Sequence, residues 1–133
     1  MSTRVLIDSS VWITFFRGKN ETVVRAVGDL LRKNQAVISG VILIELLQGA
    51  ANEMELEKIL KLLEPVERIE PAGKDWESAG RLSHRLRKKG QTISTVDVLI
   101  ATLAIENGCP LYTEDSHFDF IREQSDLELY RPE

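Results

Sequence analysis

Short apolar runs along the chain alternate with longer stretches in which apolar residues recur at helical spacing. Residues 4–7 and 36–39 are brief runs rich in branched apolar side chains, which is typical of strands buried in a parallel sheet. Residues 66–70 alternate between apolar and polar positions before a proline and therefore predict an edge strand. Two further strands are predicted over residues 111–113 and 127–130.

Helical patterns fill the intervals between the strands, and polar capping residues and glycines mark their ends. Helices are predicted over residues 9–17, 20–33, 41–49, 52–64, 74–89, 95–106 and 114–122. The helix over residues 41–49 has apolar residues on every side, so we expect it to be buried. The helix over residues 74–89 is amphipathic, and Trp76 falls on its apolar face.

The order of these elements along the chain is β-α-α-β-α-α-β-α-α-β-α-β. Consecutive parallel strands need helical crossovers, and those helices cover the faces of the sheet. The sequence therefore predicts an α/β fold, a three-layer α/β/α sandwich with a central parallel β-sheet. At this length we expect residues 1–133 to form one domain around one hydrophobic core.

The formal net charge of −4 disfavours a protein that coats nucleic acid by bulk electrostatics, but it leaves open an enzyme that acts on nucleic acid. Basic residues gather in two groups that solvated helix faces would explain: residues 81–89, and Arg17, Lys19, Arg25, Arg32 and Lys33. The single cysteine, Cys109, excludes an intramolecular disulfide and suits a reducing compartment. The first residues lead straight into a strand without a basic leader or long apolar run, so we expect a soluble cytoplasmic protein without membrane contact.

Four acidic residues stand in places where the hydrophobic pattern does not explain them. Asp8 ends the first strand, Asp115 follows the strand over residues 111–113, and Asp97 opens the helix that leads into that strand. Such positions converge on the edge of a parallel sheet where ligands bind. Glu45 is surrounded in the sequence by apolar residues, and a buried carboxylate must be protonated, salt-bridged or bound to a cation.

Each acid also has a structural explanation when it is considered alone. Asp8 and Asp115 can cap helices, Asp97 fits a capping box with Ser94, and Glu45 can belong to an ion pair. Together, however, like charges brought this close repel unless a cation lies among them. An all-oxygen set suits Mg²⁺ or Mn²⁺, and a site of this kind hydrolyses phosphodiesters.

The two histidines do not fit this site by their spacing. His84 lies in the basic helix and His117 lies beside Asp115, but neither has the spacing of a zinc site or of a nucleophile with its base. We therefore interpret both as structural or surface residues.

Four motifs in this chain resemble those of the PIN-domain ribonucleases, specifically the VapC-type toxins of prokaryotic toxin–antitoxin pairs. They follow the family's order and spacing: IDSSVWI at 7–13, ISGVILIELLQG at 38–49, STVDVLIATLA at 94–104 and LYTEDSHF at 111–118. The resemblance covers nearly the whole chain. It implies a Mg²⁺- or Mn²⁺-dependent endoribonuclease whose pocket and metal site are formed by the matching acids Asp8, Glu45, Asp97 and Asp115.

The resemblance also implies polar roles for Ser10 and Thr113, either supporting the metal site or contacting the substrate. It implies a homodimer, a cognate antitoxin that inserts a segment across the active site, and a structured RNA substrate such as tRNA or ribosomal RNA loops. Glu114, an extra acid beside Asp115, departs from the family pattern and leaves the ligand at that position open. Because carboxylates repel phosphate, we expect cations on the rim to hold RNA, and Arg17 is one of the nearest by chain position.

Three other functions are alternatives to this interpretation. A PIN nuclease of RNA processing would act without an antitoxin. A phosphoacceptor receiver domain has an acidic pocket too, but it needs a lysine just after the last strands, and residues 127–133 contain none. A non-catalytic interaction module is expected to have lost at least one of the four acids, which are all present.

Overall fold

The strands of the computed structural model, which describes residues 3–132, form one parallel sheet in the order β3-β2-β1-β4. The four strands are β1 Val5–Ile7, β2 Ala36–Ile38, β3 Glu67–Arg68 and β4 Leu111–Tyr112. The central strand β1 pairs with β2 on one side and with β4 on the other. The predicted central parallel sheet is therefore confirmed, and β3 is an edge strand as its alternation indicates.

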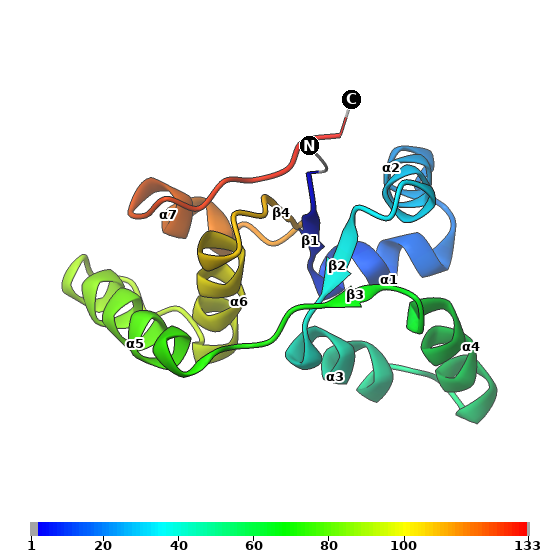
Figure 1. The fold of residues 1–133 in the computed structure, drawn as a ribbon, viewed down its shortest axis with the longest axis horizontal. Coiled ribbons are helices and arrows are strands. Elements are labelled where there is room, and N and C mark those ends of the chain that lie inside the picture. The colour runs from blue at the N-terminus through cyan, green and yellow to red at the C-terminus, as the bar shows by residue number, and fades with distance from the viewer. Residues whose placement is uncertain (1–2, 133) are drawn as a thin grey trace.

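Seven helices surround the sheet within the described residues. They are α1 Ser9–Arg17, α2 Glu21–Arg32, α3 Gly40–Gln48, α4 Glu53–Leu63, α5 Gly73–Lys88, α6 Thr95–Glu106 and α7 His117–Glu123. In Figure 1 the helices α1 to α4 lie to one side of the strands, and α5 to α7 lie to the other side. This arrangement confirms the predicted α/β/α sandwich.

Several helix ends lie where capping residues and glycine predict them. The side chains of Asn20 and Asn52 accept hydrogen bonds from the backbone N–H groups of Val23 and Glu55, at 3.2 and 2.9 Å. Gly18 ends α1 with φ of +72°, a left-handed conformation that glycine adopts without steric cost.

The apolar pattern predicts that α3 is buried, but the helix that is buried along most of its length is α6. Residues 98–104 of α6 are all buried, because α6 lies between α5 and the sheet. In α3 only Ile42 and Leu46 are fully buried, and the Ile44 side chain is 61% exposed. The prediction of a buried α3 is wrong because α3 packs against α1 and α4 and has an outer face that no element covers.

Two further expectations require correction. Trp76 does not join the core: it is 59% exposed, and α5 packs on α6 through Leu82 and Leu86. Residues 127–130 do not form a strand, because β4 is only two residues long and offers this segment a single parallel bridge, from Leu111 to Leu129.

None of the helices in residues 3–132 combines the length and the apolar composition needed to cross a membrane.

Candidate active site

The carboxylate of Asp8 lies at the end of β1 and is turned toward the segment that follows β4. Asp8 is 4% exposed and stands at the N-cap position of α1, but its side chain makes no capping bond. Its Oδ2 atom instead accepts hydrogen bonds from the Ser10 hydroxyl at 2.8 Å and the Thr113 hydroxyl at 2.9 Å. The capping explanation for Asp8 is therefore wrong.

The hydroxyls of Ser10 and Thr113 connect α1 to the chain beyond β4. Ser10 Oγ accepts a hydrogen bond from the backbone N–H of Glu114, and Thr113 Oγ1 accepts one from the backbone N–H of Asp115, both at 3.0 Å. Each hydroxyl thus donates to Asp8 while it accepts from the backbone. This arrangement fixes the orientation of the Asp8 carboxylate.

Glu45, on α3, has a carboxylate oxygen without a partner. Its Oε1 atom is buried and makes no hydrogen bond within the described part of the chain. No lysine or arginine among residues 3–132 forms a salt bridge with it. The ion-pair explanation is therefore wrong, and this oxygen requires either a proton or a cation.

Electrostatics connect Asp8, Glu45 and Asp97, although the three come from different elements. Burial raises the pKa of Asp8, the hydrogen bonds from Ser10 and Thr113 oppose that rise, and the charge of Asp97 adds to it. Burial likewise raises the pKa of Glu45. Hydrogen bonding with the Ser9 side chain opposes the rise, and the charges of Asp8 and Asp97 add to it. The three carboxylates therefore repel one another within one site.

Asp97, Asp115 and His117 form the other side of this site. One ligand atom from each lies within 4.8 Å of those of the other two. The Ser94 hydroxyl accepts the N–H of Asp97 at 3.1 Å, as in a capping box. The Asp97 carboxylate, however, faces His117, with 3.5 Å between Oδ2 and Nδ1. Asp97 thus starts α6 with its backbone and contributes its carboxylate to the cluster.

His117 is exposed, as expected of a surface residue, but its imidazole also lies beside the carboxylates of the cluster, which was not predicted from the sequence. Asp115 Oδ1 accepts the backbone N–H of His117 at 2.9 Å, and this turn brings the imidazole Nδ1 to 3.3 Å from the same oxygen. The signal in the sequence is a histidine two residues after an aspartate that ends a strand. His84 is likewise exposed, on α5, as expected.

Two other charged residues are not part of the cluster. Glu114 is exposed and accepts a hydrogen bond from the Thr14 hydroxyl at 2.7 Å, so Asp115 is the acid of this pair that reaches the site. Arg17 is exposed in the last turn of α1. A helix rises about 1.5 Å per residue, so Arg17 begins about 12 Å from the end of α1 that carries Ser9.

The chemistry of the cluster fits a hard divalent cation. It offers carboxylate oxygens from Asp8, Glu45, Asp97 and Asp115, including one buried oxygen without a partner. The imidazole of His117 adds a nitrogen, a ligand that Mn²⁺ accepts more readily than Mg²⁺.

Replacing Thr113 with valine is expected to destabilise the cation-free protein more at pH 7 than at pH 4. The Thr113 hydroxyl donates to Asp8, and a hydrogen bond to a charged group contributes about 1.5–3 kcal/mol. That contribution is present when Asp8 is ionised and decreases when Asp8 is protonated. Urea unfolding at the two pH values measures the difference in the free energy of unfolding.

A matched control is Thr102→Val, because the Thr102 hydroxyl donates to a backbone carbonyl that does not titrate. This control should lose the same free energy of unfolding at both pH values. An equal pH dependence in the two variants would show that Thr113 does not act on the charged form of Asp8.

Comparisons with known proteins agree with this geometry. The family model of the PIN domain matches residues 5–123. VapC ribonuclease Mb1587 of Mycobacterium bovis is 31% identical over 130 residues, which are 93% of this chain and 96% of the relative. Two solved structures share the fold: VapBC2 from Rickettsia felis bound to a DNA fragment from their promoter, and VapBC-5 from Mycobacterium tuberculosis, a member of the VapBC family of toxin–antitoxin systems.

The first structure has a TM-score of 0.79 at 23% identity and covers 98% of this chain and 100% of its own. The second has a TM-score of 0.70 at 21% identity and covers 97% of this chain and 98% of its own. The chain belongs to the PIN-domain family, as a member of its VapC type.

Proposed function

We propose that this chain is an endoribonuclease that hydrolyses phosphodiester bonds in structured RNA and depends on Mg²⁺ or Mn²⁺. The observation that supports it most is the buried, unpartnered Oε1 atom of Glu45 in electrostatic contact with Asp8 and Asp97. A cation among the carboxylates would compensate that repulsion while they remain ionised. The relative from Mycobacterium bovis is named a ribonuclease, which supports RNA as the substrate.

Asp8 and Asp97 are the proposed direct ligands, and Glu45 and Asp115 would act directly or through water. Mg²⁺ or Mn²⁺ held there would supply positive charge to the phosphate and would lower the pKa of a water molecule, so that the water could lose a proton and act as the nucleophile. Glu45, whose pKa burial raises, is the acid of the cluster best suited to accept a proton during the reaction. Ser10 and Thr113 hold the Asp8 carboxylate in place, because both hydroxyls already donate to it.

The proposal extends to a cognate antitoxin and a homodimer. The solved structure from Mycobacterium tuberculosis is described as a toxin–antitoxin system. Exposed apolar side chains often mark interfaces, and among residues 3–132 the large ones are Ile13, Phe16, Ile44, Met54, Trp76 and Val96. A cytoplasmic location completes the proposal, because the single cysteine, which is free and buried, forms no intramolecular disulfide and suits a reducing compartment.

RNA end-mapping after induced expression tests the proposed activity. The wild type should create new RNA ends at a few defined sites, and Asp8→Ala should create none. Asp126→Ala is the matched control, because Asp126 is exposed and lies outside the cluster. New ends that persist with Asp8→Ala would contradict the proposal.

A further inference from the structure

A groove runs between α2 and the last residues of the described chain, and we call it the α2 groove. It has a volume of about 330 Å³ and is lined mainly by polar side chains of α2, by Gln35 and by residues 130–132. None of these residues belongs to the carboxylate cluster. The groove therefore needs its own explanation.

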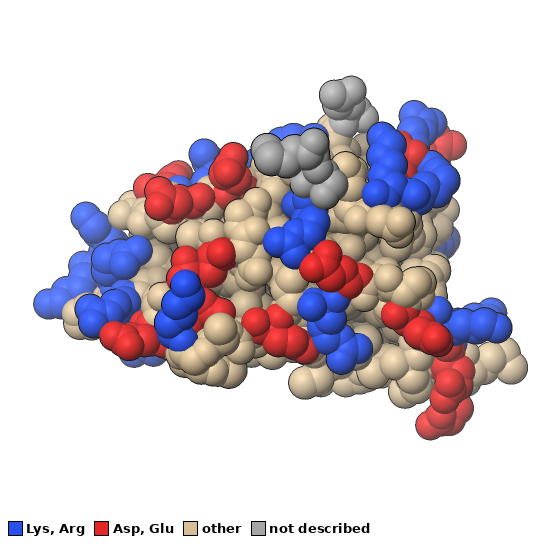
Figure 2. All heavy atoms as spheres, viewed as in Figure 1, with Lys and Arg blue, Asp and Glu red and all other residues tan. Residues whose placement is uncertain are grey.

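The α2 groove carries an excess of positive charge. Three cations line it: Arg25 of α2, Lys33 directly after α2, and Arg131 of the C-terminal segment. Among the described residues, neither Arg25 nor Lys33 forms a salt bridge, and Arg131 approaches Asp119 only at 4.0 Å. Figure 2 shows lysine and arginine side chains gathered over α2 at the upper right of the molecule.

One acid, Asp29, also lines the groove, but it is already paired with Arg32 of the next helical turn. The opposite wall includes Tyr130, whose ring packs against the buried ring of Tyr112 with 5.0 Å between the centroids. Cations beside an aromatic wall in a concave site are typical of surfaces that bind nucleic acid. A solvated helix face would not have this shape.

The α2 groove lies at the end of the sheet where the strands β1 and β2 begin, and the carboxylate cluster lies at the end where β1 stops. Gln35 stands just before β2, and its carbonyl accepts the N–H of Val5 at the start of β1, at 2.7 Å. Asp8 follows the end of β1, and a strand of three residues spans about 10 Å. In Figure 1, α2 and the start of β1 lie toward the top of the view, and α3 starts below the sheet.

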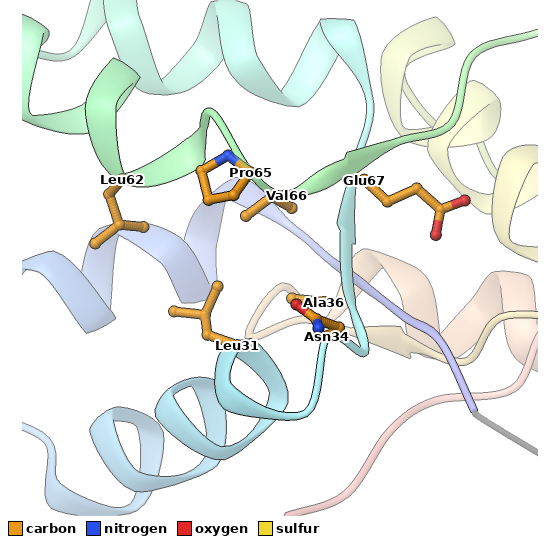
Figure 3. A pocket seen from close by; sticks show the side chains of 7 residues that line it. All are labelled: Leu31, Asn34, Ala36, Leu62, Pro65, Val66 and Glu67. Atoms are coloured by element: carbon orange, nitrogen blue, oxygen red, sulfur yellow. The ribbon is translucent and has the colours of Figure 1, made fainter.

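A neighbouring cavity of similar size has a different chemistry. It lies between the ends of α2 and α4 beside β3, and Leu31, Leu62 and Val66 contribute apolar surface to it (Figure 3). Its one charged residue is Glu67, which forms a salt bridge with Arg4 at 2.7 Å. This second cavity has no cation to offer a phosphate, so the α2 groove alone of the two suits RNA.

We propose that the α2 groove binds backbone phosphates of the RNA substrate away from the cleavage site. This inference rests on the proposed endoribonuclease activity. The carboxylate cluster repels phosphate, so a remote cationic groove supplies affinity that the site itself cannot supply. Because the two sites lie at opposite ends of the sheet, a folded RNA of several nucleotides reaches both, whereas one nucleotide does not.

Binding of a labelled RNA hairpin tests the proposal, with fluorescence anisotropy as the readout and Asp8→Asn in every protein to prevent cleavage. The double substitution R25A/K33A should weaken binding about tenfold and lower the slope of log affinity against log salt by about 1.4–1.8, since two phosphate contacts are lost. K58A/K61A on α4 removes the same charge from another exposed helix and is the matched control. The control should bind within about twofold of the parent protein.

Cleavage of the same hairpin by the otherwise wild-type chain provides the second readout. R25A/K33A should raise KM about tenfold and leave kcat unchanged, because it removes binding away from the reacting phosphate. If the wild type cleaves RNA but both double variants lose equal affinity, the effect is general charge and the groove proposal is overturned. If the wild type neither binds nor cleaves RNA, the proposed function itself fails.

Two other occupants are also tested. Binding of 5′-AMP that R25A/K33A abolishes, together with unchanged RNA affinity, would assign the groove to free nucleotides and overturn the proposal. Loss of binding to the cognate antitoxin with unchanged RNA affinity would make the groove a protein-binding surface, which also overturns it.

Discussion

Asp97→Asn should lower the rate of RNA cleavage by at least about a thousandfold, with the fold unchanged. Asp97 lies between the two sides of the site, since its charge raises the pKa values of Asp8 and Glu45 and its Oδ2 faces His117. A cation at such a site contributes several kcal/mol to the transition state, and about 4 kcal/mol corresponds to a thousandfold in rate. The backbone N–H of residue 97 still bonds to Ser94, so α6 should start normally.

Single-turnover cleavage with Mg²⁺ measures this rate, and thermal unfolding checks the fold. Asp126→Asn, an exposed aspartate outside the cluster, should cleave within about twofold of the wild type. The wild type should also lose activity in excess chelator. Full activity with chelator present would refute the dependence on a divalent cation.

Glu45→Gln should raise the melting temperature of the cation-free protein by at least about 3 °C, or roughly 1 kcal/mol for a chain of this size. Glutamine keeps the shape of the side chain but removes the charge that burial, Asp8 and Asp97 all disfavour. Added Mg²⁺ should raise the melting temperature of the wild type by mass action and that of the variant by less. Destabilisation of several kcal/mol in the cation-free variant would instead indicate that the carboxylate has a structural partner.

The same substitution should change how stability depends on pH. Burial raises the pKa of Glu45 above 4.5, so the folded chain keeps a proton that the unfolded chain has already released. The contribution of Glu45 to stability is therefore complete below pH 4.5 and is lost as the pH rises through the raised pKa. Urea unfolding without divalent cations should show a smaller decrease between pH 4.5 and pH 7.5 in Glu45→Gln than in the wild type.

The elements that the sequence predicts well are those that local chemistry determines. Asn20 and Asn52 cap helices through contacts three residues away, and Gly18 ends α1 through its own backbone conformation. The burial of α3 could not be predicted in the same way. An apolar segment such as residues 41–47 does not indicate how many neighbours will cover it, and here the fold leaves Ile44 exposed.

The candidate site shows the same limit. Asp8 and Asp115 were brought together as predicted, because parallel strands end at one edge of the sheet. His117 was missed because a backbone turn, from the Asp115 carboxylate to the N–H of His117, directs its ring back to the site. The predicted RNA contact of Arg17 stays a prediction, because the residue is exposed in the last turn of α1, about 12 Å along the helix from Ser9.

The hydrogen bonds from Ser10 and Thr113 also determine when the site can form during synthesis. The two hydroxyls are 103 residues apart in the sequence, and the central strand β1 receives its partner β4 only at Leu111 and Tyr112. The ribosome makes chains from the N-terminus, so until residues 111–115 have been made Asp8 has no Thr113 to orient it and Asp115 does not yet exist. A nascent or prematurely terminated chain that ends before residue 111 therefore lacks the assembled carboxylate cluster, and a cell making it would be exposed to the complete site only after residues 111–115 have been made.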